Sequence, residues 1–340
     1  MFTKELWDKY ADVVIWSLFE AMKTAGGKYA SGDTVIIHCN ANSLSLAKTV
    51  SKKLIGLGLK SKSMILNNNA PWMTIVDKRN DLDKYGWAYC TVATKALAQQ
   101  AGLTLEQYEA EVIKACYLDQ SDPVGVWKKL NAEAAEIRKW LMRLKVDRLH
   151  VESANVDLKV TIGQDRKWLG ISGYNMPSFE IYTSPDWRGT SGRYFANTRS
   201  LRDGQLVQDV KLVFRQGEVV EASAAEGEEF LRSQLAVPGG NRLGEFSLTD
   251  KRFSPISKFM ADTLFDENAG QPNGNCHVAI GYSHANTYGG RSGWFSFWKK
   301  NKGFNQSAVH WDLINTEPKR VTAYLSGGKV VIYEDGQFRY

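Results

Sequence analysis

The chain has 340 residues, of which 43% are hydrophobic and 24% are charged, and its formal net charge at pH 7 is +6. This composition is typical of a soluble globular protein with one large domain or two ordinary ones. The positive charge is modest for this length and is not gathered into long basic runs. We therefore expect a solvated surface and no nucleic-acid partner.

The N-terminal stretch MFTKELWDKYADVVIWSLFEAMK mixes charges with apolar residues at helical spacing. It predicts an amphipathic helix rather than a signal peptide or a membrane span. The four cysteines are scattered without a CxxC pair, which indicates buried thiols in a reducing compartment; they are Cys39, Cys90, Cys116 and Cys276. We therefore expect a cytoplasmic protein that has no membrane partner.

From Gly32 onward, the sequence GDTVIIHCNANSLSLAKTVSKKLIGLGLKSKSMILNN has an apolar run, a helical pattern and a second apolar run. This order predicts a strand, a helix and a parallel strand. Neither GxGxxG nor GxxxxGK[ST] stands at the first turn, so dinucleotide and P-loop phosphate binding are not supported.

Two further helices are expected before residue 145. Thr104 and Gln107 have capping-box spacing at the start of one, and Asp122-Pro123 opens the other. After residue 146, stretches such as DRLHVESANVDLKVTIG and VKLVFRQGEVVEASA are typical of strands and hairpins. We therefore predict an α/β protein in which residues 1–145 form an N-terminal α/β scaffold domain with a parallel sheet. Residues 146–340 are expected to form a strand-rich α+β C-terminal metal-binding domain.

Three of the five histidines fall between residues 277 and 310, and acidic residues occur in unusual contexts around them. These acidic residues are Glu245 in RLGEFSL, Asp266 and Glu267 after TLF, and Asp312 in SAVHWDLI. In a strand, positions two apart share a face, so His310 and Asp312 can reach the same ion. A single histidine in an apolar strand is more often a hydrogen-bonded core residue, so the interpretation depends on the whole set. Imidazole and carboxylate together suit zinc, manganese or cobalt, whereas calcium prefers oxygen ligands alone.

At this point the C-terminal half resembles the thermophilic-type metalloaminopeptidases of family M29. Five segments carry the resemblance in order, and they are MPSFEIYTSP, LGEFSL, DTLFDENA, HVAIG and NQSAVHWDLI. The resemblance implies two divalent ions per chain, which are zinc, cobalt or manganese. The implied ligands are Glu180, Glu245, Glu267, His277, His310 and Asp312, with Glu245 as the bridging carboxylate.

The resemblance also implies a function, namely removal of N-terminal residues from peptides with a free N-terminus by attack of a metal-bridged water. We expect Glu245 to move the proton of that water to the leaving amine. Family members form homodimers, so a homodimer is expected here. The alternative is an M29-like protein that binds metal or peptide and is catalytically weak or inactive.

One position departs from the family pattern. The family has a tyrosine seven residues after the histidine of HVAIG, where it is thought to stabilise the oxyanion, and this chain has His284 there. A local shift could supply the phenol of Tyr282 or Tyr288 instead, or His284 could donate the hydrogen bond itself. A surface position with no role is the third interpretation of His284.

Overall fold

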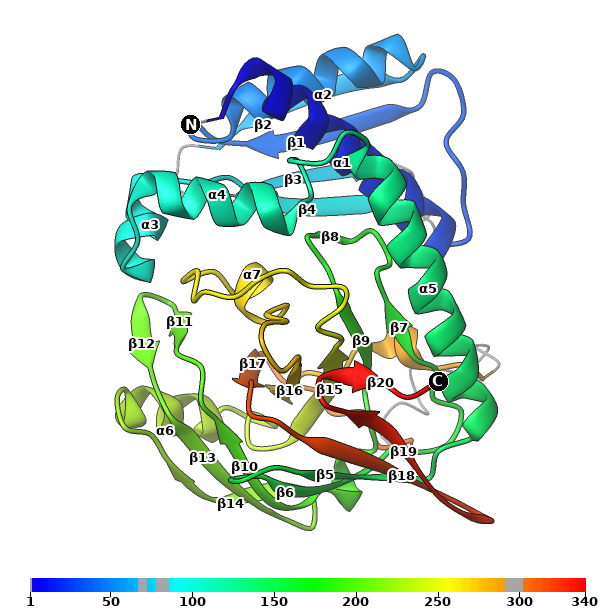
Figure 1. Cartoon of the computed structure of the whole chain (residues 1–340), viewed down its shortest axis with the longest axis vertical. Coiled ribbons are helices and arrows are strands. Elements are labelled where there is room, and N and C mark those ends of the chain that lie inside the picture. The colour runs from blue at the N-terminus through cyan, green and yellow to red at the C-terminus, as the bar shows by residue number, and fades with distance from the viewer. Residues whose placement is uncertain (1, 67–71, 78–85, 291–301) are drawn as a thin grey trace. The chain divides into compact units, whose positions relative to one another are not determined.

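The computed structural model describes residues 2–66, 72–77, 86–290 and 302–340 (Figure 1). It is a mixed α/β protein with helices and several sheets. The chain divides into two compact units, one of Met1–Ala132 with Ile171–Ser178 and one of Glu133–Gly170 with Phe179–Tyr340. The first change of unit falls within helix α5 (Pro123–Leu144). The domain boundary expected at residue 145 stays a prediction.

The first unit contains a five-stranded sheet in the order β2-β1-β3-β4-β8. Its strands are β1 (Thr34–Cys39), β2 (Lys60–Ile65), β3 (Trp72–Asp77), β4 (Trp87–Thr91) and β8 (Asn175–Met176). The strand, helix and parallel strand predicted from Gly32 onward are present as β1, α2 and β2. The sheet is mixed rather than parallel throughout, because β1–β2 and β4–β8 pair in parallel whereas β3 lies between β1 and β4 and runs antiparallel to both.

Helices of the first unit are α1 (Lys4–Thr24), α2 (Leu44–Gly56), α3 (Lys95–Ala101) and α4 (Leu105–Ala115). The predicted amphipathic helix is confirmed as α1, in which the apolar residues from Tyr10 to Leu18 are all buried and the charged Asp12 is exposed. Thr104 and Gln107 form the predicted capping box of α4. Helix α5 begins at the proline as predicted, and the Asp122 carboxylate accepts a hydrogen bond from the Gly125 amide at 2.8 Å.

The second unit contains an eight-stranded antiparallel sheet in the order β14-β13-β10-β6-β5-β18-β19-β20. Its strands are β5 (Arg148–Glu152), β6 (Asp157–Thr161), β10 (Ser191–Ala196), β13 (Val210–Arg215), β14 (Glu218–Ser223), β18 (Arg320–Leu325), β19 (Gly328–Glu334) and β20 (Gln337–Phe338). Buried and more exposed residues alternate along β5, β6 and β13, as expected for a sheet with one solvated face. A hairpin of β11 (Ser200–Arg202) and β12 (Gln205–Val207) and helix α6 (Glu228–Ala236) complete this part.

A second sheet of this unit, which we call the site sheet, has the order β17-β16-β15-β9-β7. Its strands are β7 (Leu169–Gly170), β9 (Glu180–Thr183), β15 (Leu243–Thr249), β16 (Asn275–Gly281) and β17 (His310–Asn315). Every residue of β9, β15 and β16 is buried, so both faces of these strands lie in the interior. Short helices α7 (Thr263–Asp266), η1 (Trp187–Gly189) and η2 (Ala285–Thr287) lie in the connections.

One irregularity in the site sheet sets the direction of a charged side chain. Leu243 pairs with Ile280, whereas Glu245 pairs with Ala279, so Gly244 is an extra residue in β15. A Cβ at Gly244 would stand 2.2 Å from the Tyr282 carbonyl oxygen, so only glycine fits this bulge.

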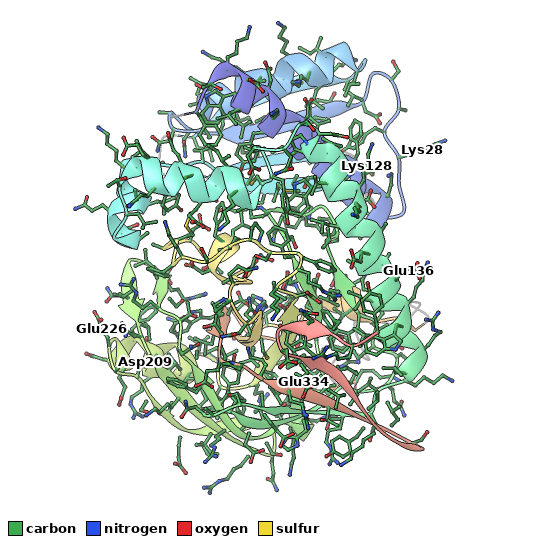
Figure 2. All side chains as sticks on the ribbon, in the orientation of Figure 1. Lys28, Lys128, Glu136, Asp209, Glu226 and Glu334 are labelled. Carbon is green, nitrogen blue, oxygen red and sulfur yellow. The ribbon has the colours of Figure 1, made fainter. Side chains whose placement is uncertain are left out.

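The eight-stranded sheet is tied to the site sheet by a buried phenol. The Tyr194 hydroxyl of β10 contacts the carbonyl oxygens of Cys276 and Leu313 at 2.9 and 2.8 Å. All four cysteines are buried free thiols, which confirms that part of the sequence analysis. In the part of the chain that the structure describes, no helix combines the length and apolar character needed to cross a bilayer. Charged side chains of both signs, such as Lys28, Glu136 and Glu226, are exposed (Figure 2).

Candidate metal centre

Four strands of the site sheet place five of the six candidate ligands on one face, with Glu180 in β9 opposite Thr249 in β15. Glu245 in β15 is opposite Ala279 in β16, and Ala279 is in turn opposite Asp312 in β17. His277 is two residues from Ala279 in β16, and His310 is two residues from Asp312, so these side chains point to the same side. The methyl group of Ala279 leaves room between the two carboxylates.

The opposite face of the same strands is apolar. Phe246, Val278 and Trp311 are each 1% exposed or less. Cys276, two residues before Val278, belongs to this face and points away from the cluster. The site sheet therefore carries charge on one face and core packing on the other.

His277 is the centre of a fully buried group. Its Nε2 lies 3.3 Å from Glu180 Oε2 and 3.3 Å from Glu245 Oε1. The three side chains offer ligand atoms that all lie within 4.8 Å of one another, so they could hold one ion. We call Glu180, Glu245 and His277 the inner group.

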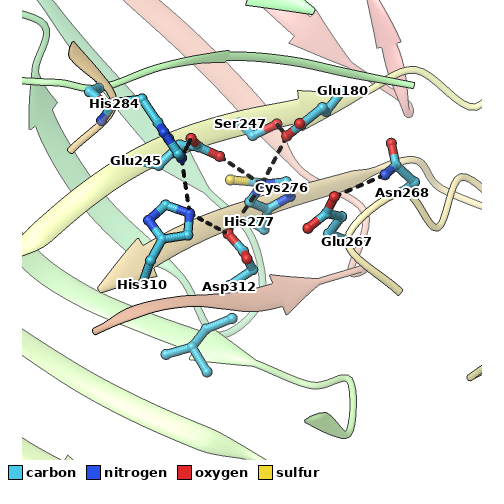
Figure 3. A network of polar contacts seen from close by, with 12 residues as sticks. Glu180, Glu245, Ser247, Glu267, Asn268, Cys276, His277, His284, His310 and Asp312 are labelled. Carbon is cyan, nitrogen blue, oxygen red and sulfur yellow. Dashed lines mark hydrogen bonds and ion pairs between the residues drawn. The ribbon is translucent and has the colours of Figure 1, made fainter. Parts of the chain in front are cut away.

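A second group shares Glu245 with the first (Figure 3), and its two histidines are only partly buried. His284 Nε2 lies 3.5 Å from Glu245 Oε2 and 3.3 Å from His310 Nε2. The His284 and His310 side chains are 38% and 27% exposed, whereas the His277 side chain is 0% exposed. We call Glu245, His284 and His310 the outer group.

Two further carboxylates lie beside these groups. Asp312 Oδ1 is 3.8 Å from His277 Nε2 and 3.7 Å from His310 Nε2, so it lies between the inner and outer groups. Glu267 directly follows α7, and its Oε1 accepts a hydrogen bond from Asn268 at 3.3 Å. Glu267 is in neither three-residue group, although its charge interacts with those of Glu180 and Asp312.

The clustered carboxylates create a strong local preference for positive charge. Burial lowers the pKa of His277, but its contacts with Glu180 and Glu245 outweigh this and raise the pKa well above the usual value. Burial lowers the pKa of His310 as well, and the charges of Asp312 and Glu245 reverse the shift, so that the pKa is raised. A cation placed among these oxygens would satisfy the same preference.

The remaining shifts follow mainly from burial. Burial, followed by repulsion from Glu180 and Asp312, raises the pKa of Glu267 well above its usual value. Partial burial lowers the pKa of His284 against the attraction of Glu245. Asp266 is held in the core by the Met260 and Asp262 amides, and its pKa is raised well above the usual value, chiefly by burial.

Neighbouring groups hold the candidate ligands in position. His310 Nδ1 lies 2.9 Å from the Tyr282 carbonyl oxygen, which assigns the proton to Nδ1 and leaves the Nε2 lone pair facing the cluster. Ser247 Oγ donates to Glu180 Oε2 at 3.2 Å. His277 Nδ1 has no hydrogen-bond partner among the described residues.

The six residues that the family resemblance implied as ligands lie near one another in the structure, and His284 lies beside them. Tyr282 contributes its carbonyl oxygen, and its ring meets the His284 ring edge-on at 5.7 Å between centroids. Tyr288 contacts the Phe304 ring at 6.3 Å. Sequence reasoning missed Ser247, although its position two residues after Glu245 was the same signal that linked His310 with Asp312.

The distances suit a divalent ion. Two atoms bound to one tetrahedral Zn²⁺ at about 2.0–2.1 Å lie about 3.4 Å apart. Within the two groups, the separations to His277 and His284 run from 3.3 to 3.5 Å. The fold and the donor set thus define a mixed α/β protein with a carboxylate and imidazole centre of the kind found in metal-dependent hydrolases.

Comparison with known proteins identifies the family. Residues 60–338 match the family described as thermophilic metalloprotease (M29). The chain therefore belongs to the M29 family of metallopeptidases. It is 28% identical to "Aminopeptidase PepS" of Streptococcus thermophilus over 283 residues, which cover 75% of this chain and 66% of that protein. Matches to three of the curated relatives span 55 to 66% of their lengths.

Two solved structures share the fold. Wild-type AmpT from Thermus thermophilus superposes with a TM-score of 0.73 at 17% identity and covers 98% of this chain and 99% of that chain. A 2,5-dihydroxypyridine dioxygenase from Pseudomonas putida KT2440 superposes with a TM-score of 0.52 at 13% identity, covering 99% and 98%. Because one fold hosts two chemistries, the function has to be argued from the site.

Proposed function

We propose that this chain is a metal-dependent aminopeptidase that uses two divalent ions, zinc, cobalt or manganese, to hydrolyse the first peptide bond of peptides. One observation carries the two-ion part of the proposal. The two oxygens of Glu245 face different histidines, with Oε1 toward His277 and Oε2 toward His284. A carboxylate that bridges two ions needs this divergent arrangement. The membership in M29 supports the peptidase part.

The proposed ligands form a charge-balanced set. Glu180, Glu245, Glu267 and Asp312 bring four negative charges, and His277 and His310 bring neutral nitrogens when they bind an ion. Two dications would therefore offset the carboxylates. When bound, such ions lower the pKa of water from 15.7 toward about 7 and polarise a carbonyl group.

The residues of the chain have distinct tasks in this proposal. Glu245 orders the two ion positions, and the half-exposed outer group faces the side from which a peptide can enter. The free α-amino group of the peptide would bind there as a neutral amine, which accounts for the need for an unblocked N-terminus. Glu245 is also the proposed carrier of the proton to the leaving amine.

A second candidate function is metal or peptide binding with weak or no catalysis. It is favoured by His284, because an imidazole replaces the tyrosine implied by the family resemblance at the proposed oxyanion position. The Tyr282 ring meets the His284 ring, and the Tyr288 ring meets the Phe304 ring.

The cellular setting is proposed from the state of the cysteines. Four buried free thiols support a reducing compartment such as the cytoplasm. The homodimer is proposed from the family resemblance alone. Size-exclusion chromatography with light scattering would test it, and a monomer at micromolar concentration would contradict it.

The first test is hydrolysis of aminoacyl p-nitroanilides and free dipeptides by wild type and Glu245→Gln, each stripped of metal and resupplied with zinc, cobalt or manganese. We expect turnover that requires metal and a free amino terminus and that falls at least about a hundredfold in Glu245→Gln. Metal content separates the two roles of Glu245, because loss of ions indicates a ligand and retained ions with lost turnover indicate proton transfer. Absence of turnover with every metal, in protein that binds two ions, would favour the second candidate.

A further inference from the structure

The outer group contains one histidine more than the ligand set implied by the family resemblance. That histidine, His284, lies just before η2, on the connection that follows β16. Its Nε2 is 3.5 Å from Glu245 Oε2 and 3.3 Å from His310 Nε2. A surface histidine without a role would not be expected to point its ring nitrogen at two candidate ligands.

We infer that His284 is a metal ligand, which together with Glu245 and His310 forms the outer of two ion positions. This inference rests on the proposed two-ion function and deepens it. Two imidazoles and one carboxylate with an open position form a donor set typical of catalytic zinc sites, and the same set also binds other divalent transition metals.

The loop that carries His284 is held at both backbone ends. The His284 amide donates a hydrogen bond to Ser184 Oγ at 2.7 Å, and the His284 carbonyl oxygen accepts one from Thr287 Oγ1 at 2.7 Å. Such bonds fix the direction of the side chain before any ligand arrives. Preorganisation of this kind is what a metal ligand on a loop requires.

Aromatic rings fix the imidazole itself. The Tyr182 and Tyr282 rings meet His284 edge-on at centroid distances of 6.0 and 5.7 Å, and the His310 ring meets it at 4.6 Å. The His310 contact could also be a hydrogen bond between two neutral rings. In that case the His284 Nε2 would carry a proton, and His284 could not bind a metal through that atom.

The two ion positions should differ in exchange with solvent. The His277 side chain in the inner group is fully buried, whereas the outer histidine side chains are 38% and 27% exposed. We therefore expect the inner ion to resist chelators and the outer ion to leave first. Substitution of His284 should weaken binding of the outer ion and leave binding of the inner ion unchanged.

The test is a Co²⁺ titration of metal-free protein, followed by visible absorption and by competition with a chelator. His284→Phe keeps an aromatic ring against Tyr182 and Tyr282 but removes the ligand nitrogen. His150→Phe is the matched control, because His150 pairs with Asp157 at 2.7 Å in the eight-stranded sheet and touches no candidate ligand. His284→Ala is a second variant in case the larger ring disturbs the loop, and circular dichroism of the metal-free proteins checks folding.

We expect wild type and His150→Phe to bind two Co²⁺ ions per chain. In both His284 variants, the affinity for the weaker ion should fall at least about tenfold, and its absorption bands should change. Two ions bound by folded His284 variants with wild-type affinity and spectrum would overturn the inference, and so would a wild-type stoichiometry of one. A wild type that binds two ions with this dependence on His284, yet cleaves no peptide, would overturn only the aminopeptidase proposal.

Discussion

The two large sheets of the second unit are both antiparallel, yet they differ in where their charged side chains lie. In the eight-stranded sheet, residues alternate between buried and more exposed along β5, β6 and β13. In the site sheet, all residues of β9, β15 and β16 are buried, and charged side chains are among them. A charge in the first sheet can be solvated, whereas a charge in the second needs a partner.

Two histidines make the difference concrete. His150 lies in β5 and contacts Asp157 at 2.7 Å, and the Asp157 side chain is 58% exposed. His277 in β16 is fully buried, with three carboxylates within 4 Å of its Nε2. Exposed ion pairs contribute little free energy, but a buried cluster with excess negative charge is costly without a cation. Such a cluster therefore marks function more reliably than the residue types alone.

The comparison predicts its largest effect at these two histidines. Replacement of His277 by Ala should remove the inner ion and lower kcat/KM for a dipeptide about a thousandfold or more. Replacement of His150 by Ala should leave kcat/KM within about twofold and lower the free energy of unfolding by about 1 kcal/mol, because its side chain is only 17% exposed. Equal losses of activity in the two variants would show that the site sheet has no special chemistry.

The next effect concerns Lys319, which precedes β18 on the segment that leads out of the site sheet. This residue is 5% exposed, and burial lowers the pKa of its ammonium group from 10.5 to about 8. Because the folded state disfavours the proton, Lys319 destabilises the protein below pH 8 by about 3 kcal/mol, and this penalty disappears as pH rises from 8 to 10.5.

The variant Lys319→Met removes the titrating group and keeps an apolar chain of similar length. Urea unfolding at pH 7 should therefore show the variant to be more stable than wild type, with the difference shrinking toward pH 10. The hydrogen bond from the Lys319 ammonium to the Glu317 carbonyl oxygen is lost as well, which reduces the gain. A difference that does not depend on pH would contradict the assigned pKa.

A smaller effect is expected for Tyr194, whose hydroxyl joins the eight-stranded sheet to the site sheet. Tyr194→Phe removes the hydroxyl that bonds the carbonyl oxygens of Cys276 and Leu313 and should lower the free energy of unfolding by about 1–2 kcal/mol. Since Tyr194 contacts no candidate ligand, the number of bound ions should be unchanged. Loss of an ion in this variant would mean that the tie between the sheets also sets the metal site.

Local signals made much of the fold predictable. The capping box at Thr104 and the Asp122-Pro123 start depend on neighbouring residues, and alternation identified strands of the eight-stranded sheet. Strand β3 was missed, because its position depends on pairing with β1 and β4 rather than on a local pattern. The prediction of a parallel sheet failed for the same reason, since it left out the antiparallel strand β3.

Part of the candidate site could be predicted for a similar reason. His310 and Asp312 are two residues apart, so their shared face could be predicted from strand geometry. The approach of His284 to Glu245 depends on how the connection after β16 folds back over the sheet, and no spacing in the sequence encodes it. Family resemblance supplied the remaining ligands, and it offered a different role for position 284.

The extra residue at Gly244 has a consequence for how such proteins are recognised. If β15 were regular from the Leu243–Ile280 pair onward, Glu245 would be opposite Val278 and would point to the apolar face. A side chain at position 244 would crowd the Tyr282 carbonyl oxygen and work against the bulge, so one substitution there could turn the shared carboxylate out of the centre while every ligand residue remained in the gene. A search for the ligand residues alone would still count that protein as intact, so the residue at position 244 is as informative as the ligands themselves.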